Sequence, residues 1–150
     1  MASIKLEAAA ITTVASTELN SLANAALALG AEYDNSSGLY LYGLFELNVT
    51  FGSNPTAGNT VDLYLIPAPD GTNYDDAVTG ASGTAPITTY VGGFPLRAVT
   101  TAQKVPLGIG LTLVNLPPTK FKVAVKNGSG QAFPSSGSTV KLIPYRYQSV

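Results

Sequence analysis

The stretch LYLYGLFELNVTF, residues 39–51, decides the fold of this chain. Read with a period of two, one of its faces holds only apolar residues and glycine: Leu39, Leu41, Gly43, Phe45, Leu47, Val49 and Phe51. Side chains alternate across a β-strand, so this pattern predicts a long strand with one buried face. The opposite face begins with Tyr40, Tyr42 and Leu44 and then turns polar. We therefore expect the first half of the strand to be covered on both sides, by a helix or by a neighbouring subunit.

The candidate helix lies just before this strand, at residues 17–29. Ser16 or Thr17 can cap its N-terminus, and Glu18 lies in the first turn, where the helix dipole favours an acid. Leucines and alanines recur there at helical spacing, and Gly30 is a natural stop. This apolar stripe is expected to pack on the sheet, with binding of a partner as the alternative. Residues 1–15 are predicted to form an N-terminal arm or an edge strand.

The rest of the chain alternates short apolar segments with clusters of turn residues. Such segments occur at 60–67, 87–99, 103–116, 120–127, 131–133 and 139–147. With residues 39–51 they predict a mainly β protein, an antiparallel β-sandwich or jelly roll of about seven or eight strands with one short N-terminal helix. Residues 16–150 form a single domain in this interpretation.

Charge is scarce and unevenly distributed along the chain. Charged residues make up 11% of the sequence, against about 25% in a typical soluble domain, which favours either burial in an assembly or a neutral Ser/Thr/Gly-rich surface. One base and nine acids give residues 1–76 a charge of −8, whereas seven bases give residues 77–150 a charge of +7. Either the two halves interleave and pair their charges within the domain, or an acidic patch meets a basic patch on a neighbour. The net charge of −1 argues against direct nucleic-acid binding.

Several kinds of chemistry are excluded by residue type. The chain has no Cys and no His, which removes the usual zinc sites and nucleophile–base pairs. Glu46 and Asp62 are the best carboxylate pair for glycoside hydrolysis, but as alternating polar positions on strands they are expected to face solvent. The acidic loop at 67–86, with Asp70, Asp75 and Asp76, does not match the calcium-loop spacing. We expect no enzyme, no cofactor and no metal site, and no apolar run is long enough to span a membrane.

Binding is the remaining class of function. The sequence holds eight tyrosines and no tryptophan, and an exposed tyrosine can stack on a sugar or anchor a protein interface. Sugar platforms often use tryptophan, so its absence mildly favours contact with protein.

Five phrases of the sequence resemble, in this order, small virion proteins of tailed bacteriophages: ELNSLANAAL, LYLYGLFELNV, VDLYLIPAPDGTNY, YVGGFPLRA and LPPTKFKVAVKNGSG. More specifically, the chain is similar to head decoration, or cement, proteins over residues 16–147. The resemblance implies a β-sandwich that binds the outer surface of the assembled phage head and braces it. It also implies the major capsid protein and further copies of the chain as partners, with a trimer as one form. It implies no catalytic residue.

These expectations select the candidate interface residues. The N-terminal segment contributes Ile4 and Leu6, and the doubly covered half of the 39–51 strand contributes Tyr40 and Tyr42. The long loop contributes Tyr74, and the basic strand that follows Pro117-Pro118 contributes Lys120 and Lys122. A receptor- or glycan-binding module of a tail or fibre, using exposed tyrosines, is the alternative function.

Overall fold

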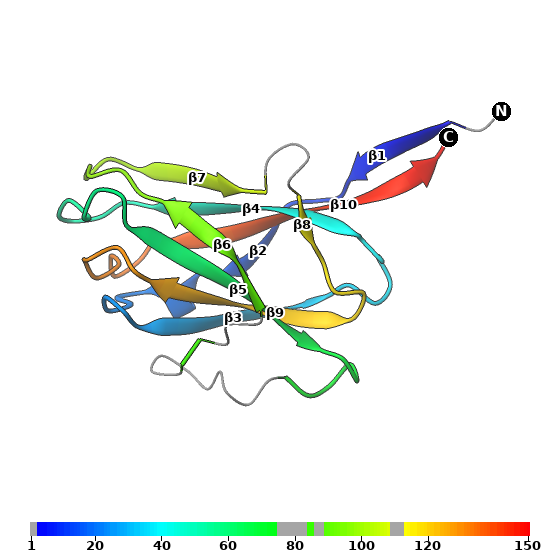
Figure 1. The fold of residues 1–150 in the computed structure, drawn as a ribbon, viewed down its shortest axis with the longest axis horizontal. Coiled ribbons are helices and arrows are strands. Elements are labelled where there is room, and N and C mark those ends of the chain that lie inside the picture. The colour runs from blue at the N-terminus through cyan, green and yellow to red at the C-terminus, as the bar shows by residue number, and fades with distance from the viewer. Residues whose placement is uncertain (1–2, 75–83, 86–88, 109–112) are drawn as a thin grey trace.

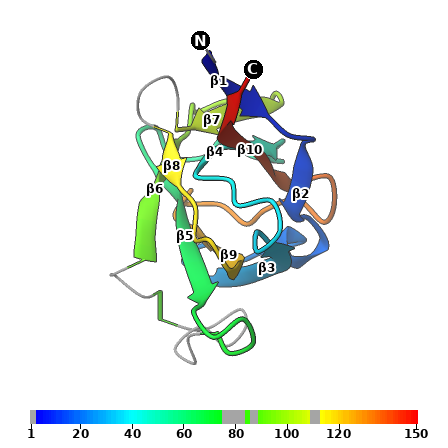
Figure 2. The ribbon, with the colours of Figure 1, turned by 90° about the vertical axis from the view of Figure 1, so that its right-hand side faces the viewer.

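The computed structural model describes residues 3–74, 84–85, 89–108 and 113–150, and these residues form two antiparallel sheets packed face to face (Figures 1 and 2). Sheet A runs in the order β1 (Ile4–Ala8), β10 (Thr139–Ser149), β4 (Tyr42–Val49) and β7 (Gln103–Leu107). In addition, β2 (Thr12–Ala15) pairs with β10, and β8 (Val114–Asn115) pairs with β4. Sheet B runs in the order β3 (Leu27–Asp34), β9 (Lys120–Asn127), β5 (Thr60–Ala68) and β6 (Tyr90–Pro95). The predicted antiparallel sandwich is confirmed, with ten strands in the described residues.

The core lies between the sheets and is organised around β4. Phe45, Leu47 and Val49 are fully buried there, and burial of each such side chain stabilises the fold by roughly 1.5–3 kcal/mol. Gly43 shares this inner face, and Tyr42, Leu44, Glu46 and Asn48 alternate outward, as the period of two predicts. Leu39 and Leu41, however, are exposed by 57% and 50% and do not belong to the buried face. The chain turns at Leu39, which adopts a left-handed φ of 46°, and the strand begins only at Tyr42.

The helix expected over residues 17–29 is not formed. Residues Thr17–Leu19 make a single 3₁₀ turn, and β3 begins at Leu27. In the described part of the chain, no helix is long and apolar enough to cross a membrane. Residues 1–15, expected to be an arm or an edge strand, hold β1 and β2 along one edge of sheet A.

Tertiary contacts override the helical spacing of this segment. Ser21 and Ala25 adopt left-handed φ values of 54° and 66°, which interrupt any helix. The buried side chain of Asn127 donates to Leu22 O at 2.9 Å, and Phe133 N–H donates to the same oxygen at 3.0 Å. The end of β9 and the chain that follows it thus supply hydrogen-bond partners to the backbone of this segment, which needs no helix to satisfy these groups.

The sheet register explains the uneven distribution of charge along the sequence. Acids of the first half lie directly opposite bases of the second half on paired strands, at Glu7/Arg146, Glu32/Lys122, Asp34/Lys120, Glu46/Lys141 and Asp62/Lys126. Opposite charges on facing positions of a ladder stabilise the pairing modestly. The two halves therefore interleave and pair their charges within the domain, as the first of the two charge hypotheses states.

Candidate interaction surface

The most distinctive feature of the molecule is a two-stranded extension that we call the terminal ribbon. It consists of β1 paired in register with residues 145–149 of β10. Figure 1 shows the ribbon projecting from one end of the sandwich, with both chain termini at its tip. Ile4 and Tyr147 on the ribbon are exposed by 74% and 57%. Apolar side chains thus project into solvent on an extended element.

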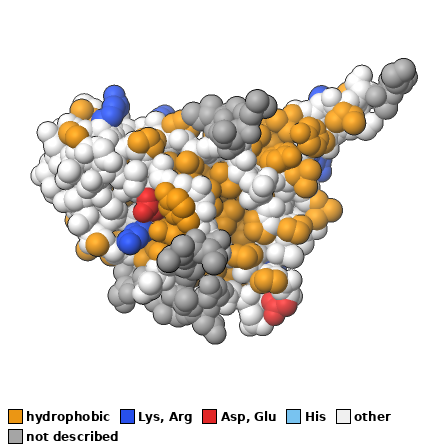
Figure 3. Space-filling view, viewed as in Figure 1, with side chains coloured by type: hydrophobic (Ala, Val, Ile, Leu, Met, Phe, Trp, Pro, Cys, Tyr) orange, Lys and Arg blue, Asp and Glu red, His pale blue; other side chains and the backbone are white. Residues whose placement is uncertain are grey.

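The outward side of the ribbon continues onto sheet A as one apolar surface, which we call the sheet A face. Its members alternate along β1, β10 and β4 and lie side by side in the register: Ile4, Leu6, Ala8, Tyr42, Leu44, Ile143, Tyr145 and Tyr147. The rings of Tyr42 and Tyr147 meet edge to face, with centroids 6.0 Å apart. Figure 3 shows hydrophobic side chains gathered at the base of the ribbon, with few charged ones near them. No described helix lies over this face, so the expected helical cover is absent.

The opposite side of the ribbon is polar and contacts the chain just before β4. Arg146 Nε donates to Glu7 Oε2 at 3.1 Å, and the guanidinium lies 5.4 Å from the centre of the Tyr40 ring. The backbone of Tyr40 is itself held by the buried side chain of Asn35, which accepts from Tyr40 N–H at 2.9 Å and donates to Tyr40 O at 2.8 Å. Tyr40 therefore connects the ribbon, through Arg146, to the part of the sandwich that Asn35 holds in place.

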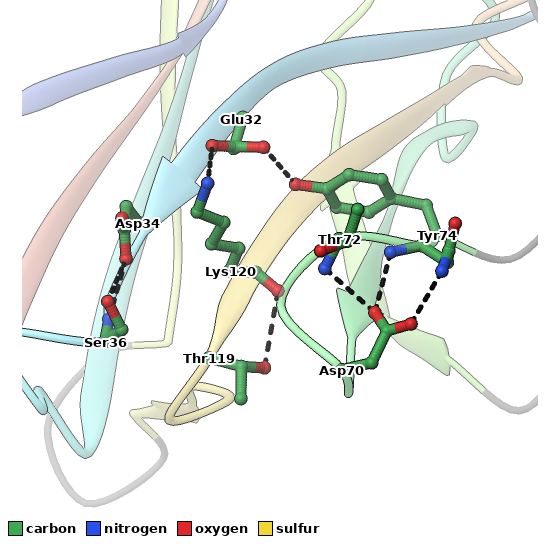
Figure 4. A network of polar contacts seen from close by, with 9 residues as sticks. Glu32, Asp34, Ser36, Asp70, Thr72, Tyr74, Thr119 and Lys120 are labelled. Carbon is green, nitrogen blue, oxygen red and sulfur yellow. Dashed lines mark hydrogen bonds and ion pairs between the residues drawn. The ribbon is translucent and has the colours of Figure 1, made fainter.

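A second cluster on the outside of sheet B brings together the other three predicted interface residues, Tyr74, Lys120 and Lys122. Figure 4 shows Tyr74 and Lys120 on either side of Glu32. Glu32 on β3 forms an ion pair with Lys120 on β9 at 3.0 Å and accepts a hydrogen bond from the Tyr74 hydroxyl. Lys122 Nζ lies 4.5 Å from the centre of the Tyr74 ring. These contacts attach the start of the long loop to the sheet.

The electrostatics of this cluster follow from its hydrogen bonds. The hydrogen bonds from Tyr74 and then from Lys120 lower the pKa of the Glu32 carboxyl. Burial, followed by the hydrogen bond to Glu32, raises the pKa of Tyr74 to about 12. Both shifts favour the ionised carboxylate and the neutral phenol at neutral pH, which is the state in which the contact forms.

Beneath this cluster lies a small apolar core on the outer side of sheet B. Leu27, Tyr64, Ile66 and Ala124 are buried there, outside the main core. Tyr74 and Ala85, which lie on either side of residues 75–83, pack against it. The long loop therefore contributes packing to the fold.

The acidic part of this loop does not gather ligands in the described residues. Asp70 accepts from the backbone N–H groups of Asn73 and Thr72 at 2.7 and 2.8 Å, and from the Asn73 side chain. Those bonds lower the pKa of Asp70 to about 2. No group of three metal-ligating side chains occurs in the described residues, and the other two predicted acids, Asp75 and Asp76, lie outside them.

The carboxylate pair considered for glycoside hydrolysis is not brought together. Glu46 lies on β4 in sheet A and Asp62 on β5 in sheet B, and each alternates outward from its own sheet. The two side chains consequently point to opposite sides of the sandwich. Although β4 and β5 follow each other in the sequence, they lie in different sheets, and both carboxylates are on outward-facing positions, as expected.

Sequence reasoning missed the contribution of β10 to the interaction surface. Val140 and Leu142 identify its buried face, and the same period of two places Ile143, Tyr145 and Tyr147 together on the other face. These residues join Leu6 and Tyr42 only because the first strand pairs with the last. No local sequence pattern predicts that pairing.

Comparisons with known proteins give only distant likenesses. No family model matches the chain, and no curated protein matches it. A solved structure of Desmodium yellow mottle tymovirus is 14% identical, with a TM-score of 0.40, covering 99% of this chain and 88% of the other. A carbohydrate-binding module of the β-sandwich superfamily is 9% identical, with a TM-score of 0.31, covering 97% of this chain and 56% of the other. TM-scores this low establish no relationship, so the chain's own residues have to indicate its function.

Proposed function

We propose that this chain is a non-enzymatic virion structural protein, a decoration protein that binds the outer surface of an assembled phage head and stabilises it. Its partners are the major capsid protein and neighbouring copies of itself. The binding element is the sheet A face together with the terminal ribbon. A protein that binds only the assembled shell stabilises that shell by mass action.

The observation that carries the proposal is the apolar character of the sheet A face, on which Ile4, Leu6 and Tyr147 are exposed and the other large side chains, on β4 and β10, are half-buried. A face on which Leu44, Ile143 and three tyrosines lie side by side is unusual for a sheet side turned to water, where polar residues normally alternate outward. Extended apolar surface on a soluble chain marks an interaction site. A neighbouring subunit, the second of the two covers expected from the sequence, therefore suits this face.

Connectivity supports the same proposal. If β1 with β2, and β7 with β8, are each counted as one interrupted strand, the sheets have the orders 1-8-3-6 and 2-7-4-5. This is the wrapping of a jelly roll, a fold found in viral capsid and lectin domains. The resemblance of the five sequence phrases to phage virion proteins favours a capsid role over a lectin role.

Glycan binding by exposed tyrosines is the alternative function. Tyr90 and Tyr147 are exposed by 51% and 57% and are its candidates. Their ring partners are inclined, with interplanar angles of 60° to Tyr64 and 87° to Tyr42. Neither pair offers a flat platform for a sugar ring, so this geometry favours protein contact.

Cosedimentation with phage particles that lack the protein tests the proposal. The wild-type chain is expected to sediment with the particles in a saturable way. Ile143→Glu places a charge in the middle of the sheet A face and should abolish binding, because the charge would have to be desolvated. Thr101→Glu adds the same charge at an exposed loop position and should bind as wild type.

Thermal unfolding of both variants provides the folding control, since neither changes a fully buried side chain. Wild-type chain that stays in the supernatant at every concentration would overturn the proposal. Saturable binding to host surface polysaccharide, lost on Tyr90→Ala or Tyr147→Ala, would transfer the function to the glycan alternative.

A further inference from the structure

The outer edge of β1 differs from the other sheet edges in having no proline or bulge to interrupt pairing, and its two charged residues, Lys5 and Glu7, are of opposite sign. Natural edge strands are blunted by charged side chains, by proline, by bulges or by cover from other elements. β7 contains Pro106, β6 contains Pro95, and β3 has a register shift between Leu29 and Glu32. β1 has neither proline nor bulge, and all five of its residues pair with β10 in unbroken register. Figures 1 and 2 show no labelled element beside its outer edge.

The free backbone groups on this edge belong to every second residue. Ser3 and Val150 exchange both of their backbone hydrogen bonds, at 2.9 and 2.8 Å. Hydrogen-bonded and non-hydrogen-bonded pairs alternate along an antiparallel ladder. The residues that direct N–H and C=O away from β10 are therefore Ile4, Leu6 and Ala8.

The terminal ribbon also lacks the support that a third strand would give. Pairing of β10 with β4 stops at Tyr145 and Tyr42, so the tip of the ribbon has two strands only. An isolated two-stranded ribbon is at best marginally stable in water. A further strand along β1 would satisfy its free backbone groups and cover its apolar side chains.

We propose that this further strand is β1 of a second copy of the chain, paired antiparallel about a twofold axis that passes through Leu6. Ile4 then lies opposite the partner's Ala8, Lys5 opposite the partner's Glu7, and Leu6 opposite the partner's Leu6. The three outward-directed residues of each strand meet their counterparts, so the free N–H and C=O groups of both strands bond to each other. The strand sequence IKLEA is thus complementary to itself.

Charge selects this register over its neighbours. A twofold axis shifted by one residue towards the N-terminus places Lys5 opposite the partner's Lys5. The opposite shift places Glu7 opposite the partner's Glu7. Like charges directly opposite each other destabilise a ladder, and only the axis at Leu6 pairs unlike charges at both positions.

Each side of the joined ribbon becomes continuous in this arrangement. On one side Leu6 extends the sheet A face across the axis to the partner's Leu6 and Tyr147. On the other side Glu7 lies between its own Arg146, at 3.1 Å, and the partner's Lys5. The pairing rests on the edge and charges of β1 and does not depend on the proposed function, and its product is a dimer that doubles the sheet A face.

Charge reversal tests the register through two variants that cannot pair with themselves but can pair with each other. The proposed dimer has two charged pairs across its twofold axis, each formed by residue 5 of one copy and residue 7 of the other, and we call these the cross-axis pairs. Lys5→Glu makes both of them acid against acid. Glu7→Lys combined with Arg146→Glu keeps the intrachain ion pair in reversed sense but makes both cross-axis pairs base against base. Each variant alone should dimerise at least about tenfold more weakly than wild type, ~1.4 kcal/mol. An equimolar mixture should recover dimerisation, because both cross-axis pairs are then unlike.

The measurement is sedimentation equilibrium or light scattering on the full chain over a wide concentration range. Recovery in the mixture shows that both variants are folded and that the register is correct. A wild-type chain that is monomeric throughout would overturn the proposal. Unchanged self-association of the two variants would also overturn it, because the contact would then lie elsewhere.

Disulfide trapping gives an independent second readout in a chain that contains no cysteine. Directly opposed Cα atoms in a hydrogen-bonded pair lie about 5.5 Å apart, within the range that a disulfide spans. Leu6→Cys should therefore form a linked dimer on mild oxidation. Ile4→Cys is the matched control on the same face, because its partner cysteine would lie about 14 Å away. Equal crosslinking at the two positions, or none at position 6, would contradict the register.

Discussion

Replacing Asn127 by alanine should lower the free energy of unfolding by roughly 3 kcal/mol, because its side chain holds the segment that was expected to be a helix. The amide is fully buried at the end of β9. It donates to Leu22 O at 2.9 Å and to Gln131 O at 2.7 Å. It accepts from the backbone N–H and the hydroxyl of Ser129, at 3.0 and 2.6 Å.

The magnitude follows from what each partner retains in the Asn127→Ala variant. Leu22 O keeps the N–H of Phe133 at 3.0 Å, and Gln131 O keeps the Ser129 hydroxyl at 2.8 Å, so these losses cost about 1 kcal/mol or less each. The backbone N–H of Ser129 loses the side-chain acceptor and remains buried, which costs about 1–3 kcal/mol. The total is roughly 2–4 kcal/mol.

Chemical denaturation at neutral pH measures this difference, with Asn54→Ala as the control. Asn54 is exposed in a loop, so its substitution should stay within about 0.5 kcal/mol of wild type. The melting temperature of Asn127→Ala should fall by roughly 6–12 °C, by the usual scaling for a chain of this size. If Asn127→Ala unfolds within about 0.5 kcal/mol of wild type with an unchanged denaturant slope, the amide does not organise this segment.

Further predictions concern the loop attachment, a close backbone approach and the support of the ribbon. The pKa of Glu32 is lowered in the folded state, so its contribution to the free energy of unfolding is present above the ordinary pKa of 4.5 and is lost as the pH falls below it. In Glu32→Gln the free energy of unfolding should no longer show this fall at acid pH. The pKa of Tyr74 is raised to about 12, so its contribution to the free energy of unfolding is complete below pH 10 and is lost as the pH rises from there to 12. In Tyr74→Phe the free energy of unfolding should no longer show this fall at alkaline pH. Gly30→Ala should destabilise by about 1–3 kcal/mol, because its Cβ would clash with Val14 O and the Val123 side chain, whereas Gly52→Ala, with nothing within 4 Å, should be neutral in the same thermal melts. Arg146→Ala should increase proteolysis of the terminal ribbon without lowering the melting temperature of the sandwich, and equal sensitivity of both would contradict its role as a brace.

The fold class was readable from the sequence because its signal is local. The period of two along residues 43–51 marks the inner and outer sides of β4 directly. The same holds for β9, where Phe121, Val123 and Val125 are buried and the lysines lie outside. These patterns depend only on the pleat of a strand, so no knowledge of its neighbours is needed.

The helix prediction failed because spacing alone cannot report long-range partners. Leu19 and Leu22 fit one helical turn and are buried, as predicted, but in the main core of the sandwich. Leu27 continues the helical spacing but belongs to β3, where it faces, together with Leu29, the small core outside sheet B. Asn127, more than a hundred residues away, hydrogen-bonds the backbone of this segment at Leu22 O, and no local pattern reports such a partner.

The candidate surface was predicted in parts but not as a whole. Ile4, Leu6 and Tyr42 were selected from separate local arguments, and they meet only because the first strand pairs with the last. Tyr74 and Lys120 also meet, through Glu32, which no local pattern singles out, and Lys122 lies over the Tyr74 ring. Sequence periodicity gives the side of a strand on which a residue lies, whereas the order of strands in a sheet is set by the packing of the whole chain.

Cryo-electron microscopy of the intact phage particle that carries this protein tests the central claim most directly. We predict density for the sandwich at regular symmetry positions on the outer shell, with the sheet A face and the terminal ribbon against neighbouring subunits. Density confined to the tail or a fibre, or a sheet A face turned to solvent in a shell-bound copy, would contradict the account.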